Sequence, residues 1–271
     1  MSQPLPRPLK KWGQNFLVDP ALREKIIREI NPQPEDVVVE IGPGTGVLTN
    51  LLIPKVRQIH AVEVDERMGA FLDPLKRAHK NFTWVVGDFL EWTPVKLPTP
   101  FRLMGNLPYY ISSPLILKTF ELRPVLVDAH FLLQKEMARR LAAEVGTKAY
   151  GILTVYARLF ARVRYLFDIS PGVFIPRPEV DSGFIRLTFT DNKNWDKNLD
   201  LTLRALVRSA FQKRRKTLRN SLASVLPVDF DLSRVLNADL RADAVTPEQY
   251  LLLAQTVVDA TGGKGLKKPV Y

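Results

Sequence analysis

Short apolar runs rich in β-branched residues alternate with helical patterns from about residue 19 to residue 190. The apolar runs occupy 36–41, 58–64, 82–86, 101–105 and 125–133. Between them, apolar positions recur at the three- and four-residue spacing of an amphipathic helix. This alternation predicts an α/β fold with a mostly parallel sheet and helices on both of its faces. The runs 161–169 and 183–190 predict a closing antiparallel pair.

A second region begins near residue 191. There the β pattern disappears, and short helical patterns continue to the end of the chain. We therefore predict a larger α/β domain over 1–190 and a smaller, all-helical domain over 191–271.

The sequence gives no sign of export or of a membrane span. No apolar run reaches the 18 or more residues that a membrane span needs. The first residues, MSQPLPRPLKKWG, lack the apolar centre of a secretory signal. We expect a cytoplasmic protein with no membrane partner.

Cysteine is absent from the 271 residues, and this excludes several kinds of chemistry. The protein can have no disulfide, no thiolate zinc site, no cysteine-ligated iron–sulfur cluster and no cysteine nucleophile. The three histidines, His60, His79 and His130, show no metal-ligand spacing. We therefore expect no metal site.

The chain is basic, with 39 Lys and Arg residues against 28 Asp and Glu residues and a formal net charge of +11. An excess of this size favours a nucleic-acid partner. The charge gathers in an N-terminal arm and in the run 204–219, neither of which contains an acidic residue. The residues expected to contact phosphates are Arg7, Lys10, Lys11, Arg208, Lys213, Arg214, Arg215, Lys216 and Arg219. For either patch alone, a solvated helix face or a flexible tail is the alternative.

The first apolar run ends in a glycine turn, Glu40-Ile41-Gly42-Pro43-Gly44-Thr45-Gly46, that opens a helical pattern. In open parallel sheets, ligands bind at the carboxyl ends of the strands, where such a turn lets backbone approach the ligand. The glycine spacing matches neither the dinucleotide fingerprint nor the P-loop, so a nucleoside without phosphate fits better. The next run reaches Glu63, whose carboxylate can accept hydrogen bonds from both hydroxyls of a ribose.

Two later strand ends carry candidate chemistry for an adenine base. Asp88 can accept from the adenine amino group, although an Asp in this place often only caps a turn. Asn106-Leu107-Pro108-Tyr109 follows the fourth run. The exocyclic amine is a poor nucleophile because its lone pair is delocalised, and two acceptors aimed at its N–H bonds would localise it. The Asn106 oxygen and a backbone carbonyl can do this, while Tyr109 offers a stacking ring. An ordinary Asn-x-Pro turn is the alternative.

These segments together resemble the KsgA-type small-subunit ribosomal RNA adenine dimethyltransferases over nearly the whole chain. The resemblance is carried by Gln14-Asn15-Phe16-Leu17, EIGPGTGVLT, Glu63, GDFLEW, NLPYYISSP, FIPRPEVDS and KRRKTLRNSL. It implies a class I, Rossmann-like methyltransferase fold that binds S-adenosyl-L-methionine (SAM), followed by a helical RNA-binding domain. The implied activity is transfer of four methyl groups in all to two adjacent adenosines near the 3′ end of 16S rRNA in the 30S subunit, with a role in small-subunit biogenesis. We expect the protein to act as a monomer.

The resemblance also assigns site residues by motif. SAM would lie against Asn15, Leu17, Gly42, Gly44, Glu63, Asp88 and Asn106. The target base would lie against Asn106, Leu107, Pro108, Tyr109 and Phe174. Tyr110 stands where relatives commonly have Asn, a difference that can reshape the base pocket.

Three other functions stay open on the sequence. Two of them, a 23S rRNA dimethyltransferase of the macrolide-resistance type and a DNA adenine methyltransferase, would use the same amine chemistry. The third is an RNA-binding ribosome assembly factor in which catalysis is secondary to binding. The segments FIPRPEVDS and RRKTLRNSL favour the small-subunit family. Independently of any family, the missing cysteine excludes covalent pyrimidine C5 methylation and cluster-based radical SAM chemistry.

Overall fold

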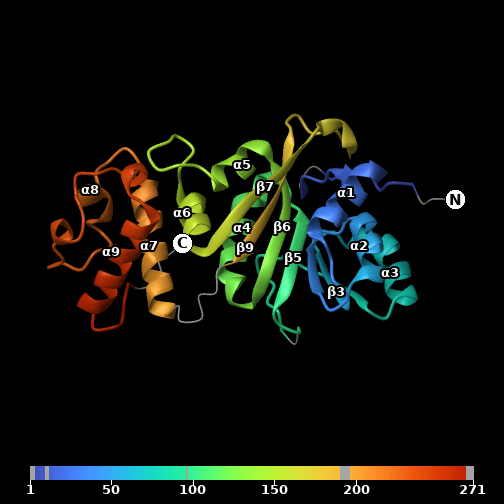
Figure 1. Ribbon diagram of the computed structural model, residues 1–271, viewed down its shortest axis with the longest axis horizontal. Helices are drawn as coiled ribbons and strands as arrows, with labels where there is room; N and C mark the ends of the chain where they lie inside the picture. The colour runs from blue at the N-terminus through green and yellow to red at the C-terminus, as the bar shows by residue number, and fades with distance from the viewer. Residues whose placement is uncertain (1–3, 10–11, 96, 190–195, 267–271) are drawn as a thin grey trace. The chain divides into compact units, whose positions relative to one another are not determined.

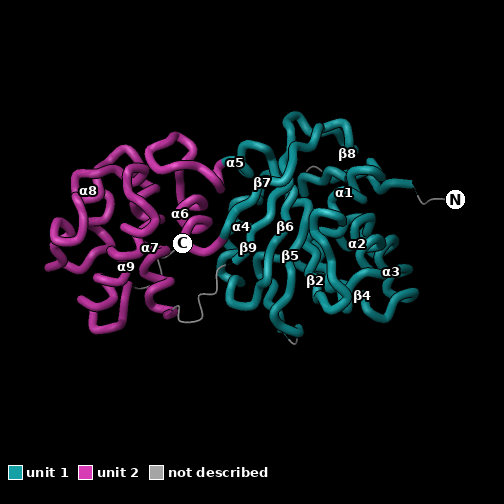
Figure 2. The backbone as a smooth tube through the Cα atoms, viewed as in Figure 1, with its two compact units in different colours: residues 1–139, 162–189 teal, residues 140–161, 190–271 magenta. Residues whose placement is uncertain are grey.

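The computed structural model describes residues 4–9, 12–95, 97–189 and 196–266. The chain forms two compact units (Figure 2), one made of 1–139 with 162–189 and the other of 140–161 with 190–271. The predicted division at residue 190 differs from this partition by the segment 140–161. Its helix α6 (Ile152–Phe160) contacts α7 (Lys197–Gln212) and α9 (Pro247–Ala260), and so belongs with the helical unit.

The first unit contains a seven-stranded sheet with the strand order β4-β3-β2-β5-β6-β9-β7 (Figure 1). Its strands are β2 (Val37–Ile41), β3 (Gln58–Glu63), β4 (Phe82–Val86), β5 (Phe101–Asn106), β6 (Leu126–Gln134), β7 (Ala161–Ile169) and β9 (Ser182–Phe189). The pairs among β2 to β6 are parallel, and β9 runs antiparallel to β6. The predicted mostly parallel sheet is confirmed, with β9 inserted between β6 and β7.

Five helices in the described part of this unit pack on the sheet. They are α1 (Pro20–Ile30), α2 (Val47–Leu52), α3 (Gly69–Ala78), α4 (Ser112–Leu122) and α5 (Lys135–Leu141). Three of them, α2, α3 and α4, lie between strands of the parallel part of the sheet. Ile26 of α1 and Leu52 of α2 share one core cluster with Val38 and Ile59 of the sheet, and α4 contacts β6. Asp19 caps α1, because its side chain accepts from the amide of Leu22 and Pro20 occupies the first helical position.

A buried ionic network lies at the amino ends of β5 and β6. Arg102 donates to both carboxylate oxygens of Asp128, at 2.9 and 2.8 Å, and to Asp36 at 2.7 Å. It also donates to the backbone carbonyls of Ile30 and Asn31 at the end of α1. The Arg102 side chain therefore donates both to two carboxylates and to backbone carbonyls at the C-terminus of α1, where carbonyls have no partner within the helix.

The second unit is helical and packs around buried aromatic side chains. Besides α6, α7 and α9 it contains α8 (Leu218–Leu222). Tyr150 and Tyr250 are fully buried, and their hydroxyls donate to the carbonyls of Val245 and Ala242. Thr246 and Gln249 form a capping box at the start of α9. In neither unit is any described helix long and apolar enough to cross a membrane.

A two-stranded sheet in the first unit joins the N-terminal segment to a later loop. Its strands are β1 (Phe16–Leu17) and β8 (Phe174–Ile175), which pair antiparallel. The amide of Val18 extends the pairing by donating to the carbonyl of Val173 at 2.9 Å. The N-terminal segment is thereby held close to the carboxyl ends of the parallel strands.

Candidate functional site

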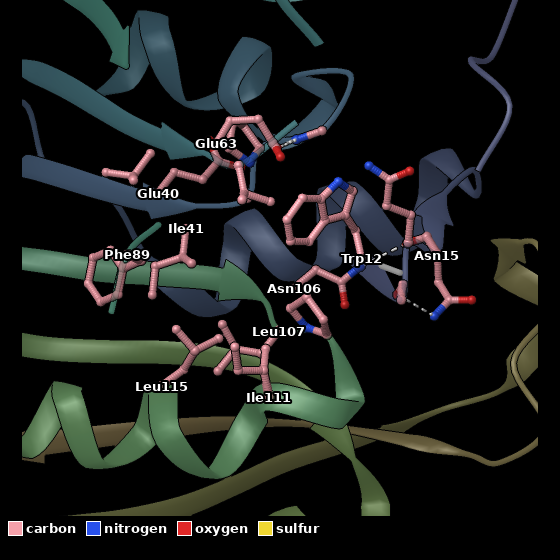
Figure 3. A pocket seen from close by; sticks show the side chains of 18 of the residues that line it. Trp12, Asn15, Glu40, Ile41, Glu63, Phe89, Asn106, Leu107, Ile111 and Leu115 are labelled. Atoms are coloured by element: carbon pink, nitrogen blue, oxygen red, sulfur yellow. Dashed lines mark hydrogen bonds between the residues drawn. The ribbon is translucent and has the colours of Figure 1, made fainter. Parts of the chain in front are cut away.

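A pocket opens in the first unit at the carboxyl ends of β2, β3 and β5 (Figure 3). β2 lies between β3 and β5, so the strand order reverses there, which is the usual ligand position in an open parallel sheet. The structure brings together around this pocket all the residues expected at the cofactor: Asn15, Leu17, Gly42, Gly44, Glu63, Asp88 and Asn106.

The glycine turn after β2 adopts a backbone that favours glycine. Gly42, Gly44 and Gly46 have φ values of 61°, 57° and 75°. A Cβ built on Gly42 would meet nothing within 4 Å, so this part of the turn faces open space. Here backbone can approach a ligand directly.

Glu63, the last residue of β3, binds the glycine turn through its side chain. It is buried, and its carboxylate accepts from the amide of Gly44 at 3.0 Å and from the amide of Asp65 at 3.0 Å. Burial raises the pKa of Glu63. Because a carboxylate offers about four acceptor positions, the group is held by two amides and can still accept from a pair of hydroxyls.

Glu40 is a second buried carboxyl group on the pocket, for which the sequence predicts no role beyond its place before the glycine turn. It is 3% exposed, and the hydroxyl of Thr49 donates to it at 2.6 Å. Burial, with a smaller contribution from the nearby charge of Glu63, raises the pKa of Glu40 to about 7. The pocket therefore contains a carboxyl group that titrates near neutral pH.

The N-terminal segment forms one wall of the pocket. Figure 3 shows the indole of Trp12 projecting into the space lined by Glu63 and Asn106. Gln14 donates to Asp65 at 2.7 Å and accepts from the amide of Leu9 at 2.9 Å, which fixes the segment. Trp12 was not among the residues predicted for the site, although it is the one aromatic residue of the N-terminal arm MSQPLPRPLKKWG.

Asn106 ends β5 at the pocket. Its amide nitrogen donates to the backbone carbonyl of Asn15 at 3.0 Å (dashed in Figure 3). The amide of Leu107 donates to the carbonyl of Leu132 at 3.1 Å, which anchors the turn to β6. This bond fixes the orientation of the Asn106 carboxamide, whose oxygen is its hydrogen-bond acceptor.

Of the residues expected at the target base, only some line the cofactor pocket. Leu107 and Pro108 line the pocket, whereas Tyr109 and Phe174 do not. Phe174 is 2% exposed and pairs with Leu17, so its ring is in the core. Tyr110, 59% exposed, lines the pocket instead, and its ring lies 3.0 Å from where a Cβ of Gly13 would stand.

Asp88 both lines the pocket and caps a turn. Its carboxylate accepts from the amide of Leu90 at 2.9 Å, the capping role that the sequence left open. Phe89 beside it is buried and stacks on Trp92 with ring centroids 5.3 Å apart. Phe89 supplies an apolar surface to the same part of the pocket.

The expected phosphate-binding residues differ in their surroundings. Arg7 is exposed, and its carbonyl accepts from Arg67, whereas Lys10 and Lys11 lie outside the described residues. In the helical unit, three residues that follow the end of α7 are exposed: Lys213, Arg215 and Lys216. Arg208, on α7 itself, is half-buried. Arg219 forms an ion pair with Asp239, with 3.5 Å between its Nε and a carboxylate oxygen.

Arg214 makes internal contacts that the acid-free run does not reveal. It donates to the carbonyls of Lys148 and Thr147 at 3.0 and 3.1 Å and to Asp243 at 3.3 Å. Its guanidinium is committed to holding the loop before α6. We therefore separate Arg214 from the exposed members of the run.

Comparison with known proteins shows similarity over most of the chain. Residues 8–259 match the model of the family described as Ribosomal RNA adenine dimethylase. The chain is also similar to proteins named Ribosomal RNA small subunit methyltransferase A. The one from Marinobacter nauticus is 39% identical over 92% of this chain and 91% of its own length. The one from Coxiella burnetii is 41% identical over 90% of this chain and 96% of its own length. A dimethyladenosine transferase from Plasmodium falciparum has a similar structure, with TM-score 0.76 and 27% identity over 91% of this chain and 98% of its own. The 23S rRNA methyltransferase ErmE also has a similar structure, with TM-score 0.65 and 27% identity over 90% of this chain and 99% of its own.

Proposed function

Since the chain belongs to the ribosomal RNA adenine dimethylase family, we propose that it transfers methyl groups from SAM to the exocyclic amines of two adjacent adenosines near the 3′ end of small-subunit rRNA. The observation that carries the proposal is the Asn106 oxygen, presented as an acceptor at the same pocket as the glycine turn and Glu63. We further propose that the protein acts as a monomer in the cytoplasm, where small subunits are assembled.

The chemistry of the pocket fits SAM. Gly42 leaves space for a ligand against the backbone, and Glu63 can accept from ribose hydroxyls. Ile41, Phe89 and Leu107 offer apolar surface for an adenine ring. Asn15, Leu17, Gly44, Asp88 and Asn106 complete the residues that would hold the cofactor.

Bound SAM supplies an electrophilic methyl group, so the protein's own task is chiefly to position the amine. The Asn106 oxygen accepts one N–H of the target amine, and a backbone carbonyl of the same turn accepts the other. This localises the nitrogen lone pair and points it at the methyl donor. No strong base is required, because the amine loses its proton readily once it has been alkylated. The side-chain amide of Asn106 is therefore sufficient, because the site needs a hydrogen-bond acceptor and not a carboxylate base.

Names of relatives support small-subunit rRNA over the alternatives. Relatives about 40% identical over most of the chain are named for the small subunit, whereas the 23S rRNA enzyme is 27% identical. The motifs FIPRPEVDS and RRKTLRNSL favour the same target. We propose that the helical region from residue 191 onward, joined by 140–161, binds the RNA.

Radiolabelled methyl transfer tests the proposed function. Small subunits, large subunits and DNA from a strain lacking the activity would be incubated with the protein and SAM, and the nucleosides analysed by mass spectrometry. We expect dimethyladenosine in small-subunit rRNA, with monomethyladenosine as an intermediate. Label in 23S rRNA or DNA instead would contradict the proposed substrate, and an end point of monomethyladenosine alone would contradict dimethylation.

Because the pKa of Glu40 is raised, we expect the affinity for SAM to depend on pH. In the unliganded protein its pKa is about 7, so below that pH the carboxyl is largely protonated. The cationic sulfonium of SAM favours the carboxylate, so binding releases a proton and affinity rises with pH up to about 7. One linked proton gives at most about a tenfold change per pH unit. Titration calorimetry between pH 5.5 and 8.5 measures this slope, and Glu40→Gln, which keeps an acceptor for Thr49, is expected to flatten it. An unchanged slope in Glu40→Gln would assign the proton elsewhere.

The exposed part of the basic run predicts a salt effect that Arg214 does not share. Each phosphate contact contributes about 0.7 to 0.9 to the slope of log affinity against log salt. Replacing Arg215 and Lys216 with alanine should therefore flatten the slope for small-subunit binding by up to about 1.8. Arg214→Ala should chiefly lower the melting temperature, because it releases the loop at Thr147 and Lys148. Arg234→Ala, at an exposed site in the same unit, is the control. An unchanged slope in the double variant would make the run a solvated face.

A further inference from the structure

Ser182 is a buried polar residue outside the pocket to which the proposed reaction assigns no role. It begins β9, is 0% exposed, and lies opposite Gln134 of β6 in the antiparallel ladder. The carbonyl of the preceding residue, Asp181, accepts from the amide of Lys135 at 2.9 Å. The backbone that carries the Ser182 hydroxyl is thus fixed by its pairing with β6 and by the bond from Lys135 at the start of α5.

The partner of this hydroxyl is the phenol of Tyr109. The two oxygens are 2.6 Å apart, and Tyr109 is only half-buried. The other end of Tyr109 is also held, because the amide of Leu107 bonds to β6 and the amide of Ile111 to the carbonyl of Pro108. The ring directly after the Asn106 turn is therefore fixed both at its backbone and at its hydroxyl.

Resting on the proposed function, we propose that Ser182 is a positioning residue that holds the ring of Tyr109 in the orientation on which the target adenine stacks. Without the bond, the ring could leave this orientation by rotation about its side-chain torsions. The resulting misplacement of the base would slow the reaction without weakening the cofactor site, since a shift of about 1 Å costs up to about 100-fold in rate.

The second methyl transfer depends more on this positioning than the first. An unmodified adenine offers two N–H groups to the acceptors near Asn106, whereas a monomethylated adenine has one. Stacking must then supply more of the orientation. A loosened Tyr109 ring should therefore change the product ratio as well as the rate.

A double-mutant cycle with Ser182→Ala and Tyr109→Phe tests the proposal, since each variant removes one side of the same hydrogen bond. For each single variant we expect kcat on small subunits to fall about tenfold, the KM for subunits and the Kd for SAM to stay within about twofold, and monomethyladenosine to accumulate. The double variant should be no slower than either single one. Multiplying effects, or wild-type rates and products in Ser182→Ala and Tyr109→Phe, would overturn the proposal.

Thr119→Val controls for the loss of a buried hydroxyl as such, because Thr119 is fully buried and donates within α4 to Leu115. It should lower the melting temperature without changing the product ratio. If Ser182→Ala does not fold, Tyr109→Phe alone decides, since it keeps the ring and removes the same bond. Failure of the proposed function appears separately, as absence of methyl transfer to small subunits by the wild-type protein.

Discussion

Replacing Asn106 with alanine is expected to slow methyl transfer about 100- to 1,000-fold, the range found when one positioned polar group is removed from a reaction centre. The variant loses the acceptor that localises the amine lone pair. It also leaves the carbonyl of Asn15 without its donor, which loosens the N-terminal wall of the pocket. The unit that carries the exposed basic run is untouched, so small subunits should still bind. Single-turnover methyl transfer and subunit binding, measured on the same preparation, test both expectations.

Asn81→Ala is a matched control for the Asn106 variant. The side chain of Asn81 also donates to backbone carbonyls, those of Ile53 and Val56, but lies outside the pocket. Its loss should lower stability and leave the rate per folded molecule close to that of the wild type. A rate for Asn106→Ala within tenfold of the wild type would remove Asn106 from the centre of the reaction. Loss of subunit binding in Asn106→Ala would contradict the proposed separation of RNA binding from catalysis.

Arg102→Met is expected to destabilise the first unit by about 3 to 5 kcal/mol, because it leaves the buried carboxylate of Asp128 and the half-buried one of Asp36 without a counter-ion. Asp36 and Asp128 lose their shared partner, and the carbonyls of Ile30 and Asn31 lose a donor. At about 2 to 4 °C per kcal/mol, the melting temperature should fall by roughly 6 to 20 °C. Scanning calorimetry measures the change.

Two further variants identify the cause of that loss. Arg234→Met removes an arginine from an exposed ion pair with Asp231 and should change stability by less than about 0.5 kcal/mol. Adding Asp128→Leu to Arg102→Met should restore part of the loss, because it removes one of the unpaired charges. A melting temperature for Arg102→Met equal to that of the wild type would mean that water replaces the guanidinium.

Local patterns in the sequence predicted the elements that depend on neighbouring residues. The β-branched apolar runs predicted the parallel strands, because a strand pattern is encoded within a few neighbouring positions. The glycine turn and Glu63 could be placed together because the carboxyl ends of neighbouring parallel strands share one edge of a sheet.

Features that depend on distant pairing could not be predicted in the same way. The insertion of β9 between β6 and β7 and the packing of 140–161 with the helical unit depend on contacts that no local period reports. The same holds for Arg214, whose partners Thr147 and Asp243 are remote in sequence. For Tyr109 and Tyr110, adjacent in sequence and alike in chemistry, only the backbone turn decides which ring reaches Ser182 and which lines the pocket.

The contact between Tyr110 and Gly13 means that these two positions are not free to vary independently. Gly13 has a φ of 55°, and a methyl group there would meet the Tyr110 ring at 3.0 Å. A library that randomises position 110 to alter which bases the enzyme accepts should therefore randomise position 13 with it. Variants with a small residue at 110 would tolerate a left-handed Asn at 13, whereas variants that keep an aromatic ring at 110 would retain glycine.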